Sequence, residues 1–252
     1  MIPTENATSE IDRVRSSGRW ARALDLLREL DPDWTEAYSR MAIEPWTNGT
    51  LSGKEIALVA VGLSGSVTTL DGSALRRHIR AALHAGATER EILEVLKMAA
   101  MVALHSMSLG APILIDEAAA AGTPLAPVAT AATPACDALR GIGQWNGAWD
   151  SFYELDPAWT EAFVSAGSGF YTSGVLTAKF VELISIAFDA SITHMYAPGV
   201  RRHVKAALAL GATAPEILAV LKLCVSQGAN ALDFGVPILA EEAAAFAGKN
   251  VP

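Results

Sequence analysis

The strongest constraint in this chain of 252 residues is an internal duplication. A shift of 125 residues lays most of the first half on the second without a gap, so that Arg76 falls on Arg201. Three pairs of segments carry the match: RELDPDWTEAY with YELDPAWTEAF, RRHIRAALHAGATEREILEVLK with RRHVKAALALGATAPEILAVLK, and GAPILIDEAAA with GVPILAEEAAA. Self-similarity at a fixed period indicates two copies of one structural unit. We expect a first repeat at 18–122, an Ala/Thr/Pro linker at 123–142 and a second repeat at 143–248.

Local signals in both repeats favour helices. The Asp-Pro pairs that begin at Asp31 and Asp156 are typical of a helix N-cap followed by proline in the first turn. Capping boxes of the form Thr-x-x-Glu start at Thr88 and Thr213. A Gly-x-Pro segment in each repeat predicts a further helix, which in the first repeat begins at Pro112. No segment alternates apolar and polar residues for long enough to predict a strand. The sequence therefore predicts an all-α fold of two similar helical lobes.

Charge and composition exclude several classes of function. A formal net charge of −8 argues against nucleic acid or an anionic membrane as a partner. The N-terminal segment lacks the apolar stretch of a signal peptide, and no uninterrupted apolar run reaches the length of a membrane span. We expect a cytoplasmic protein. Its two cysteines, Cys136 and Cys224, form no C-x-x-C motif and are expected to be free thiols.

The two repeats differ chemically in one short segment. The second repeat reads SITHMYAPGVRRH at 191–203, and the first reads SVTTLDGSALRRH at 66–78. His194 and Tyr196 therefore stand before a Pro-Gly break where the first repeat has Thr69 and Asp71. An imidazole and a phenol in a turn can donate and accept protons, although His194 could also cap the preceding helix and Tyr196 could serve as apolar filling. We take His194 as the leading catalytic candidate, with Tyr196 beside it.

Glu182 and His203 are further candidates in the second repeat. Glu182 lies in an apolar helical segment seven residues before Asp189, so the two carboxyl groups share a helix face. A carboxyl group in such surroundings either forms an ion pair or has a raised pKa. His203 closes the Arg-Arg-His motif, and because His78 closes it in the first repeat, a structural hydrogen bond is the competing interpretation.

Three more side chains complete the expected site. His105 stands on an apolar helix where the second repeat has Asn230. Such a histidine is often a core residue; the alternative is a pseudo-twofold arrangement in which this region of one lobe comes close to the reactive turn of another. Arg201 and Arg202 are candidates for holding a substrate carboxylate.

The HxxxALxxGATxxEI segments, followed by G-x-P-I-L, resemble the carboxymuconolactone decarboxylase family, which includes the AhpD-like hydroperoxidases. The resemblance covers 54–120 and 179–245. It implies all-α subunits that assemble into rings of six domains. A tandem chain is accordingly expected to form a homo-oligomer, a trimer with the same outline or a smaller assembly.

The resemblance also shows which chemistry is missing. AhpD-like members carry a Glu, a C-x-x-C motif and a closing His. Here the Glu matches Glu182, the closing His matches His203 and His78, and the first cysteine position falls near His194. Both thiols are absent, so thiol peroxidase activity is not expected.

The decarboxylase branch works without a cofactor and without the cysteine pair. We therefore expect a cofactor-free enzyme that acts by acid–base chemistry on a small oxygenated acid, lactone or ketone, as in aromatic catabolism. Decarboxylation is the first expectation, and isomerisation, hydration or retro-aldol cleavage stays open. The alternatives are a helical oligomer without catalysis and a protein that binds Zn or Fe through imidazoles and a carboxylate, although no recognised metal motif is present.

Overall fold

The computed structural model describes residues 21–123, 125, 128 and 132–249. These residues form helices joined by turns, and no strand occurs among them, which confirms the predicted all-α fold. The helices of the first repeat are α2 (Arg22–Leu30), α3 (Pro32–Thr47), α4 (Gly53–Gly65), α5 (Gly72–His84), α6 (Glu89–Met101) and α7 (His105–Ala120). Those of the second are α8 (Pro134–Gly141), α9 (Asp150–Leu155), α10 (Pro157–Gly167), α11 (Gly169–Thr172), α12 (Ala178–Ala190), α13 (Ala197–Ala209), α14 (Ala214–Val225) and α15 (Ala229–Lys249). Short 3-10 turns cover Val102–Leu104, Gly147–Trp149 and Ser226–Gly228.

The helix starts predicted at the Asp-Pro pairs and at the capping boxes are confirmed. The Asp31 carboxyl accepts a hydrogen bond from Trp34 N, and Asp156 caps α10 in the same way. Both predicted capping boxes, at Thr88 and Thr213, make their two reciprocal hydrogen bonds. Each cap satisfies backbone N–H groups that a helix N-terminus otherwise leaves without an acceptor.

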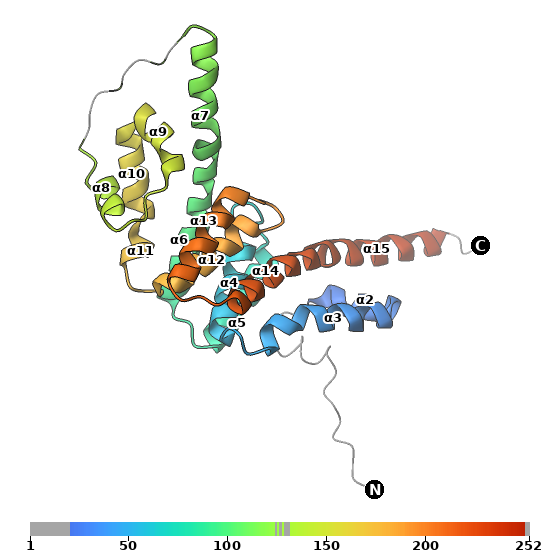
Figure 1. The fold of residues 1–252 in the computed structure, drawn as a ribbon. Helices are drawn as coiled ribbons and strands as arrows, with labels where there is room; N and C mark the ends of the chain where they lie inside the picture. The colour runs from blue at the N-terminus through green and yellow to red at the C-terminus, as the bar shows by residue number, and fades with distance from the viewer. Residues whose placement is uncertain (1–20, 124, 126–127, 129–131, 250–252) are drawn as a thin grey trace.

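The core lies where α4 and α12, the matching helices of the two repeats, pack against each other (Figure 1). Both helices are buried over most of their length, and α5, α6, α13 and α14 cover them. Gly62 permits the close approach, since a Cβ atom there would lie 3.1 Å from the Phe188 ring. The duplication thus builds one shared core rather than two separate ones.

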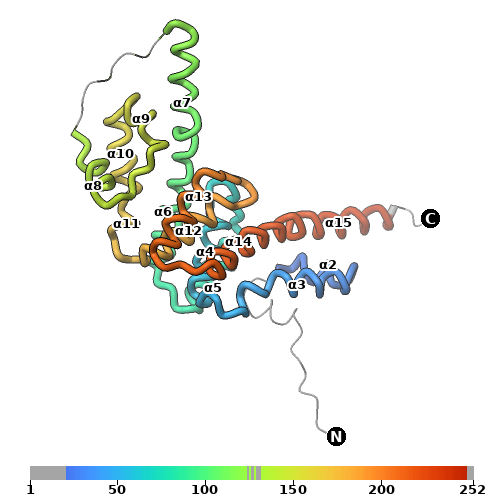
Figure 2. Tube along the Cα trace, in the orientation of Figure 1, coloured from blue at the N-terminus to red at the C-terminus, as the bar shows by residue number. Residues whose placement is uncertain are grey.

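The repeats exchange their last helices. α7 leaves the first repeat and packs on α9, whereas α15 leaves the second repeat and packs on α2. Figures 1 and 2 show α7 and α15 extending away from the centre in different directions, each beside the N-terminal helices of the other repeat. Two cavities, one at the start of α7 and one at the start of α15, are accordingly lined by residues of both repeats.

Two details differ from the sequence prediction. The helix expected to begin at Pro112 begins at His105 and contains Pro112. A proline is tolerated there at the loss of one backbone hydrogen bond, and the apolar packing of Ala111 and Phe152 holds this helix against α9. In addition, α8 lies within the range expected to be linker and packs on α10. The structure therefore extends the second lobe toward the N-terminus.

Two continuous helical stretches, Glu89–Ala120 and Ala214–Gly248, are long and apolar enough by composition to cross a membrane, with mean hydropathies of 1.7 and 1.3. Buried core helices meet the same criterion, and the first part of each stretch, α6 or α14, contributes to the central core. The outer parts expose apolar side chains at matching positions of α7 and α15: Leu109, Ile113, Leu114, Phe234, Ile238 and Leu239.

Candidate active site

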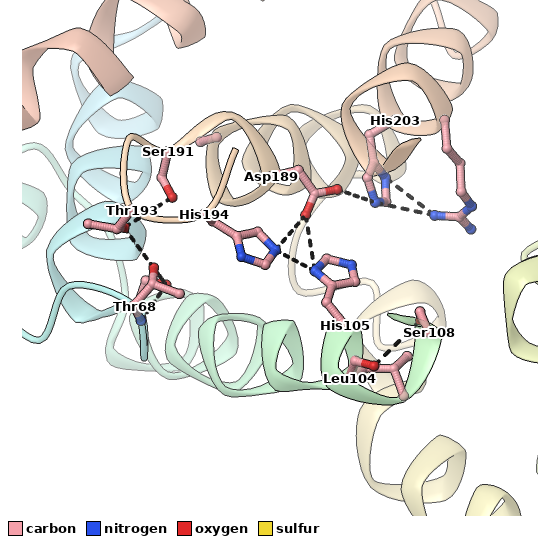
Figure 3. A network of polar contacts seen from close by, with 12 residues as sticks. Thr68, Leu104, His105, Ser108, Asp189, Ser191, Thr193, His194 and His203 are labelled. Carbon is pink, nitrogen blue, oxygen red and sulfur yellow. Dashed lines mark hydrogen bonds and ion pairs between the residues drawn. The ribbon is translucent and has the colours of Figure 1, made fainter. Parts of the chain in front are cut away.

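Five ionisable side chains from both repeats meet at one place. Glu182 and Asp189 come from α12, His194 from the turn after it, His203 from α13 and His105 from the start of α7. Figure 3 shows Asp189 between the three imidazoles. His105, Asp189 and His203 line a cavity of about 90 Å³. The exchange of α7 therefore brings His105 to the second repeat, in the arrangement that the sequence left as a possibility.

The helix α12 supplies both carboxyl groups and buries them almost completely, with Glu182 0% and Asp189 2% exposed. His203 lies between them. Its Nδ1 donates to Glu182 Oε2 at 2.6 Å, and its Nε2 lies 3.6 Å from Asp189 Oδ2. Among the residues that the structure describes, Glu182 Oε1 and Asp189 Oδ2 have no hydrogen-bond partner. Asp189 lines the cavity, so its Oδ2 is open to a ligand or to a proton there, whereas Glu182 is not among the lining residues.

Asp189 is surrounded by imidazoles without a direct hydrogen bond to any of them. Its Oδ1 lies 3.7 Å from His105 Nδ1 and 3.9 Å from His194 Nε2, which is too long for a hydrogen bond. Burial raises the pKa of Asp189 to about 7, although Arg202 acts in the opposite direction. A carboxyl group with this pKa is present in both protonation states near neutral pH, as a general acid or base requires.

His105 and His194 form a tight pair. Nδ1 of His105 lies 2.5 Å from Nε2 of His194, and the rings stack at 4.7 Å between centroids. The Tyr196 ring covers His105 at 4.1 Å. Burial, together with the neighbouring His194 and His203, lowers the pKa of His105 to about 4, and burial also lowers the pKa of His194. Both rings are therefore neutral at physiological pH, and one donates the hydrogen bond that the other accepts.

Gly199 allows Asp189 to lie at the first turn of α13. A Cβ atom on residue 199 would lie 1.8 Å from Asp189 Oδ2 and 2.7 Å from Tyr196 Cδ1, so no larger residue fits. In the first repeat the two positions hold Ser64 and Ala74, a shorter side chain facing a larger one. The exchange of a carboxyl group for a hydroxyl is thus matched by an exchange of glycine for alanine.

The turn that carries His194 has the same backbone in both repeats. Met195 and its counterpart Leu70 both have positive φ, at 51° and 49°, which is uncommon for residues other than glycine. Tyr196 N donates to Asp189 O, and Asp71 N donates to Ser64 O. The turn is therefore a shared framework, and the side chains alone distinguish the two sites.

The structure separates the two arginine candidates. Arg202 lines the cavity, and its Nη2 donates to the backbone carbonyl of Gln144 at 2.9 Å and to the side-chain oxygen of Gln144 at 3.2 Å. Tyr171 contacts Arg202 inside the cavity. Arg201, in contrast, is exposed and faces a groove on the outer surface, because consecutive helical positions point about 100° apart. Only Arg202 is placed to hold an acid in the cavity.

Sequence reasoning gave Asp189 a minor place, took Gly199 only as part of a Pro-Gly break, which the structure places in the first turn of α13, and did not single out Tyr171 or Gln144. A signal for the first two was present, since Asp189 and Gly199 both differ from their counterparts in the other repeat. Tyr171 and Gln144 also differ from their counterparts, Trp46 and Arg19, but they reach Arg202 from segments distant in sequence, so the contact itself could not be predicted.

The same constellation could hold a metal ion. One ligand atom each from His105, Asp189 and His194 lie within 4.8 Å of one another. Two imidazoles and a carboxylate are ligands that suit Zn²⁺ or Fe²⁺. The sequence spacing showed no metal motif because His105 comes from the other repeat.

Comparisons with known proteins agree with this architecture. The model of the carboxymuconolactone decarboxylase family matches residues 32–106 and 157–240, one segment in each repeat. A crystal structure from Burkholderia xenovorans LB400 is similar over 98% of this chain and 100% of its own, with 32% sequence identity and a TM-score of 0.85. That protein carries a provisional assignment as a gamma-carboxymuconolactone decarboxylase subunit. None of the curated proteins matches the sequence.

Proposed function

Because the chain belongs to the carboxymuconolactone decarboxylase family, we propose that it is a lyase that removes CO₂ from a small oxygenated acid or lactone in the cavity of the second repeat. The observation that carries the proposal is Asp189, a buried carboxyl group with a pKa of about 7 that lies within 4 Å of three imidazoles. The reaction needs a proton donor and no cofactor.

In the proposed step, the bond between the substrate carbon and its carboxylate breaks, and the electron pair moves into a conjugated carbonyl. This yields CO₂ and an enolate. The neutral carboxyl group of Asp189 then gives its proton to the enolate carbon and regains a proton from solvent, so that one carboxylate and one proton become CO₂ and a C–H bond. The imidazole N–H groups stabilise the enolate oxygen, and Arg202 holds a second carboxylate or a carbonyl of the substrate.

The test is CO₂ release by the purified protein from a panel of carboxylated lactones and β-keto acids. His194→Ala is expected to abolish turnover and to leave the helical circular dichroism signal unchanged. His84→Ala, which removes an exposed histidine of the first repeat, is the control and should keep most of the activity. Full activity of His194→Ala would exclude the proposed role of the histidine pair.

We also propose that the chain acts as a homo-oligomer, as a trimer or a dimer. The support is a groove of about 930 Å³ on the outer face of α12, α13 and α14, lined mainly by apolar side chains. Several of these, such as Ile192, Met195 and Leu208, are exposed in the single chain. Light scattering coupled to size exclusion should give a multiple of the 26.4 kDa chain mass, and Leu208→Glu should shift it toward the monomer. A monomeric wild-type protein would refute the assembly.

Metal binding is the second candidate function. It is favoured because ligand atoms of His105, Asp189 and His194 all lie within 4.8 Å of one another. Elemental analysis of the purified protein distinguishes the two candidates. Stoichiometric zinc or iron that is lost in both His105→Ala and His194→Ala supports the metal candidate. Activity that persists in thoroughly chelated protein supports acid–base catalysis.

A further inference from the structure

The first repeat contains a cavity that corresponds to the candidate active site. Its volume is about 60 Å³, and its walls come from α4, α5 and the start of α15. Most residues that line this cavity correspond at the 125-residue shift to residues that line the other, among them Arg77 with Arg202, His78 with His203, Ser64 with Asp189, and Asn230 with His105. Both repeats therefore contain a cavity at this place, but the first has Ser64 and Asn230 where the second has Asp189 and His105.

We infer that this cavity is a second ligand site, which binds a small uncharged carbonyl compound and not an acid. The inference does not require the second repeat to be catalytic.

Charge is the first argument. Arg77 Nη2 forms an ion pair with Asp233 Oδ2 at 2.7 Å, and both side chains are largely shielded from solvent. Arg202, at the matching position, bonds to the neutral oxygens of Gln144, and Ser108 stands where Asp233 stands in the other repeat. The charge of Arg77 is therefore compensated at the cavity, and a carboxylate ligand would meet the negative charge of Asp233. An uncharged ligand meets no such repulsion.

The available hydrogen-bonding groups are the second argument. Arg77 Nε is buried and has no acceptor within the described part of the chain. The Asn230 amide also lines the cavity. The hydroxyl of Ser64 is already used, because it donates to the backbone carbonyl of Ala60 at 2.7 Å. Donors without acceptors select a ligand with an acceptor oxygen, and Leu24, Leu63 and Leu223 provide apolar walls for its carbon atoms.

The cavity also borders the turn that carries His194. Gln227 lines the cavity, accepts from Ile192 N at 3.2 Å and donates to Thr69 Oγ1 at 3.2 Å. Thr69 in turn lies 3.3 Å from Thr193 Oγ1, next to His194. A ligand in this cavity therefore contacts the side chains that anchor that turn, and its binding can be followed at their amides.

The probes are γ-butyrolactone and the acid formed by opening its ring, 4-hydroxybutyrate, titrated into the full chain and followed by NMR of the Thr69, Gln227 and Asn230 groups. The lactone should shift these signals in a saturable way, and the acid should bind at least about tenfold more weakly. Asn230→Leu should abolish the lactone shifts, whereas His105→Leu, the matching change in the other cavity, should leave them intact.

A second test removes the negative charge of Asp233 and predicts a gain of binding rather than a loss. Asp233→Asn preserves the shape of the side chain and releases the charge of Arg77, so it should increase the affinity for 4-hydroxybutyrate at least about tenfold. The inference is overturned if the wild-type cavity binds the acid as tightly as the lactone, if neither probe gives saturable shifts there, or if Asp233→Asn leaves the preference unchanged. If the wild-type protein released no CO₂ in the separate activity assay, only the proposed function would be refuted.

Discussion

Asp189 and Gly199 occupy complementary positions, because the carboxyl group of Asp189 fills the space in which any larger residue at 199 would place its Cβ atom. The two residues lie on consecutive helices, α12 and α13, which pack against each other. The first repeat has Ser64 and Ala74 at these places. The carboxyl group of Asp189, the candidate proton donor, can therefore take this position only because residue 199 is glycine.

Gly199→Ala is expected to displace the Asp189 side chain and to lower activity by at least about tenfold, with a loss of about 1–3 kcal/mol in the free energy of unfolding from overpacking. Ala74→Gly is the matched change in the first repeat and should leave activity unchanged. Turnover assays and chemical denaturation measure the two effects. Wild-type activity in Gly199→Ala would show that the exact position of Asp189 does not matter for turnover.

Activity should fall as the pH rises through about 7. Burial raises the pKa of Asp189 to that value, so the carboxyl group loses its proton above it and can no longer protonate the enolate carbon. A pH profile of kcat between pH 5 and 9 should show this descending limb. Asp189→Asn should remove nearly all activity at every pH. A profile that stays flat from pH 6 to 9 would assign the proton donor to another group.

Asp189→Asn should also stabilise the protein at alkaline pH. A carboxyl group whose pKa is higher in the folded state favours folding most strongly below its unfolded pKa of 3.8, and this contribution is lost as the pH rises through about 7. The variant should therefore gain stability over the wild type progressively between pH ~4 and ~7, up to about 4 kcal/mol and level above that range. Urea denaturation at pH 5 and pH 8.5 checks the trend, which would be contradicted by equal differences at the two values.

His203→Ala and His78→Ala should differ strongly although both remove the closing histidine of the same motif. His203 is the hydrogen-bond partner of Glu182, which is fully buried, so its removal leaves a buried carboxyl group without that partner and should destabilise the fold by about 3 kcal/mol. His78 contacts the hydroxyl of Ser64, and Ala57 stands where Glu182 stands in the second repeat. Its removal should cost about 1 kcal/mol. Thermal unfolding of the two variants measures how much stability each has lost. Equal losses of stability would contradict this account.

Much of the fold could be predicted from local sequence. The N-caps at Asp31 and Asp156 and the capping boxes at Thr88 and Thr213 form as expected, because they depend on side chains that reach backbone groups only two or three residues away. The comparison of the repeats likewise pointed to His194 and Glu182, because both differ from their counterparts. Pro112 was misleading, since packing of the surrounding helix outweighs one lost backbone hydrogen bond.

The sequence by itself determined the helices, the duplication and the repeat in which the ionisable side chains gather, because these follow from periodicity and short-range hydrogen bonds. Only the tertiary structure decided that α7 crosses to the second repeat and sets His105 against His194, and that Arg202 rather than Arg201 faces the cavity. It also decided the protonation behaviour of Asp189. A raised carboxyl pKa requires burial among α7, α12 and α13 together, and burial is a property of the packed chain that no single segment carries.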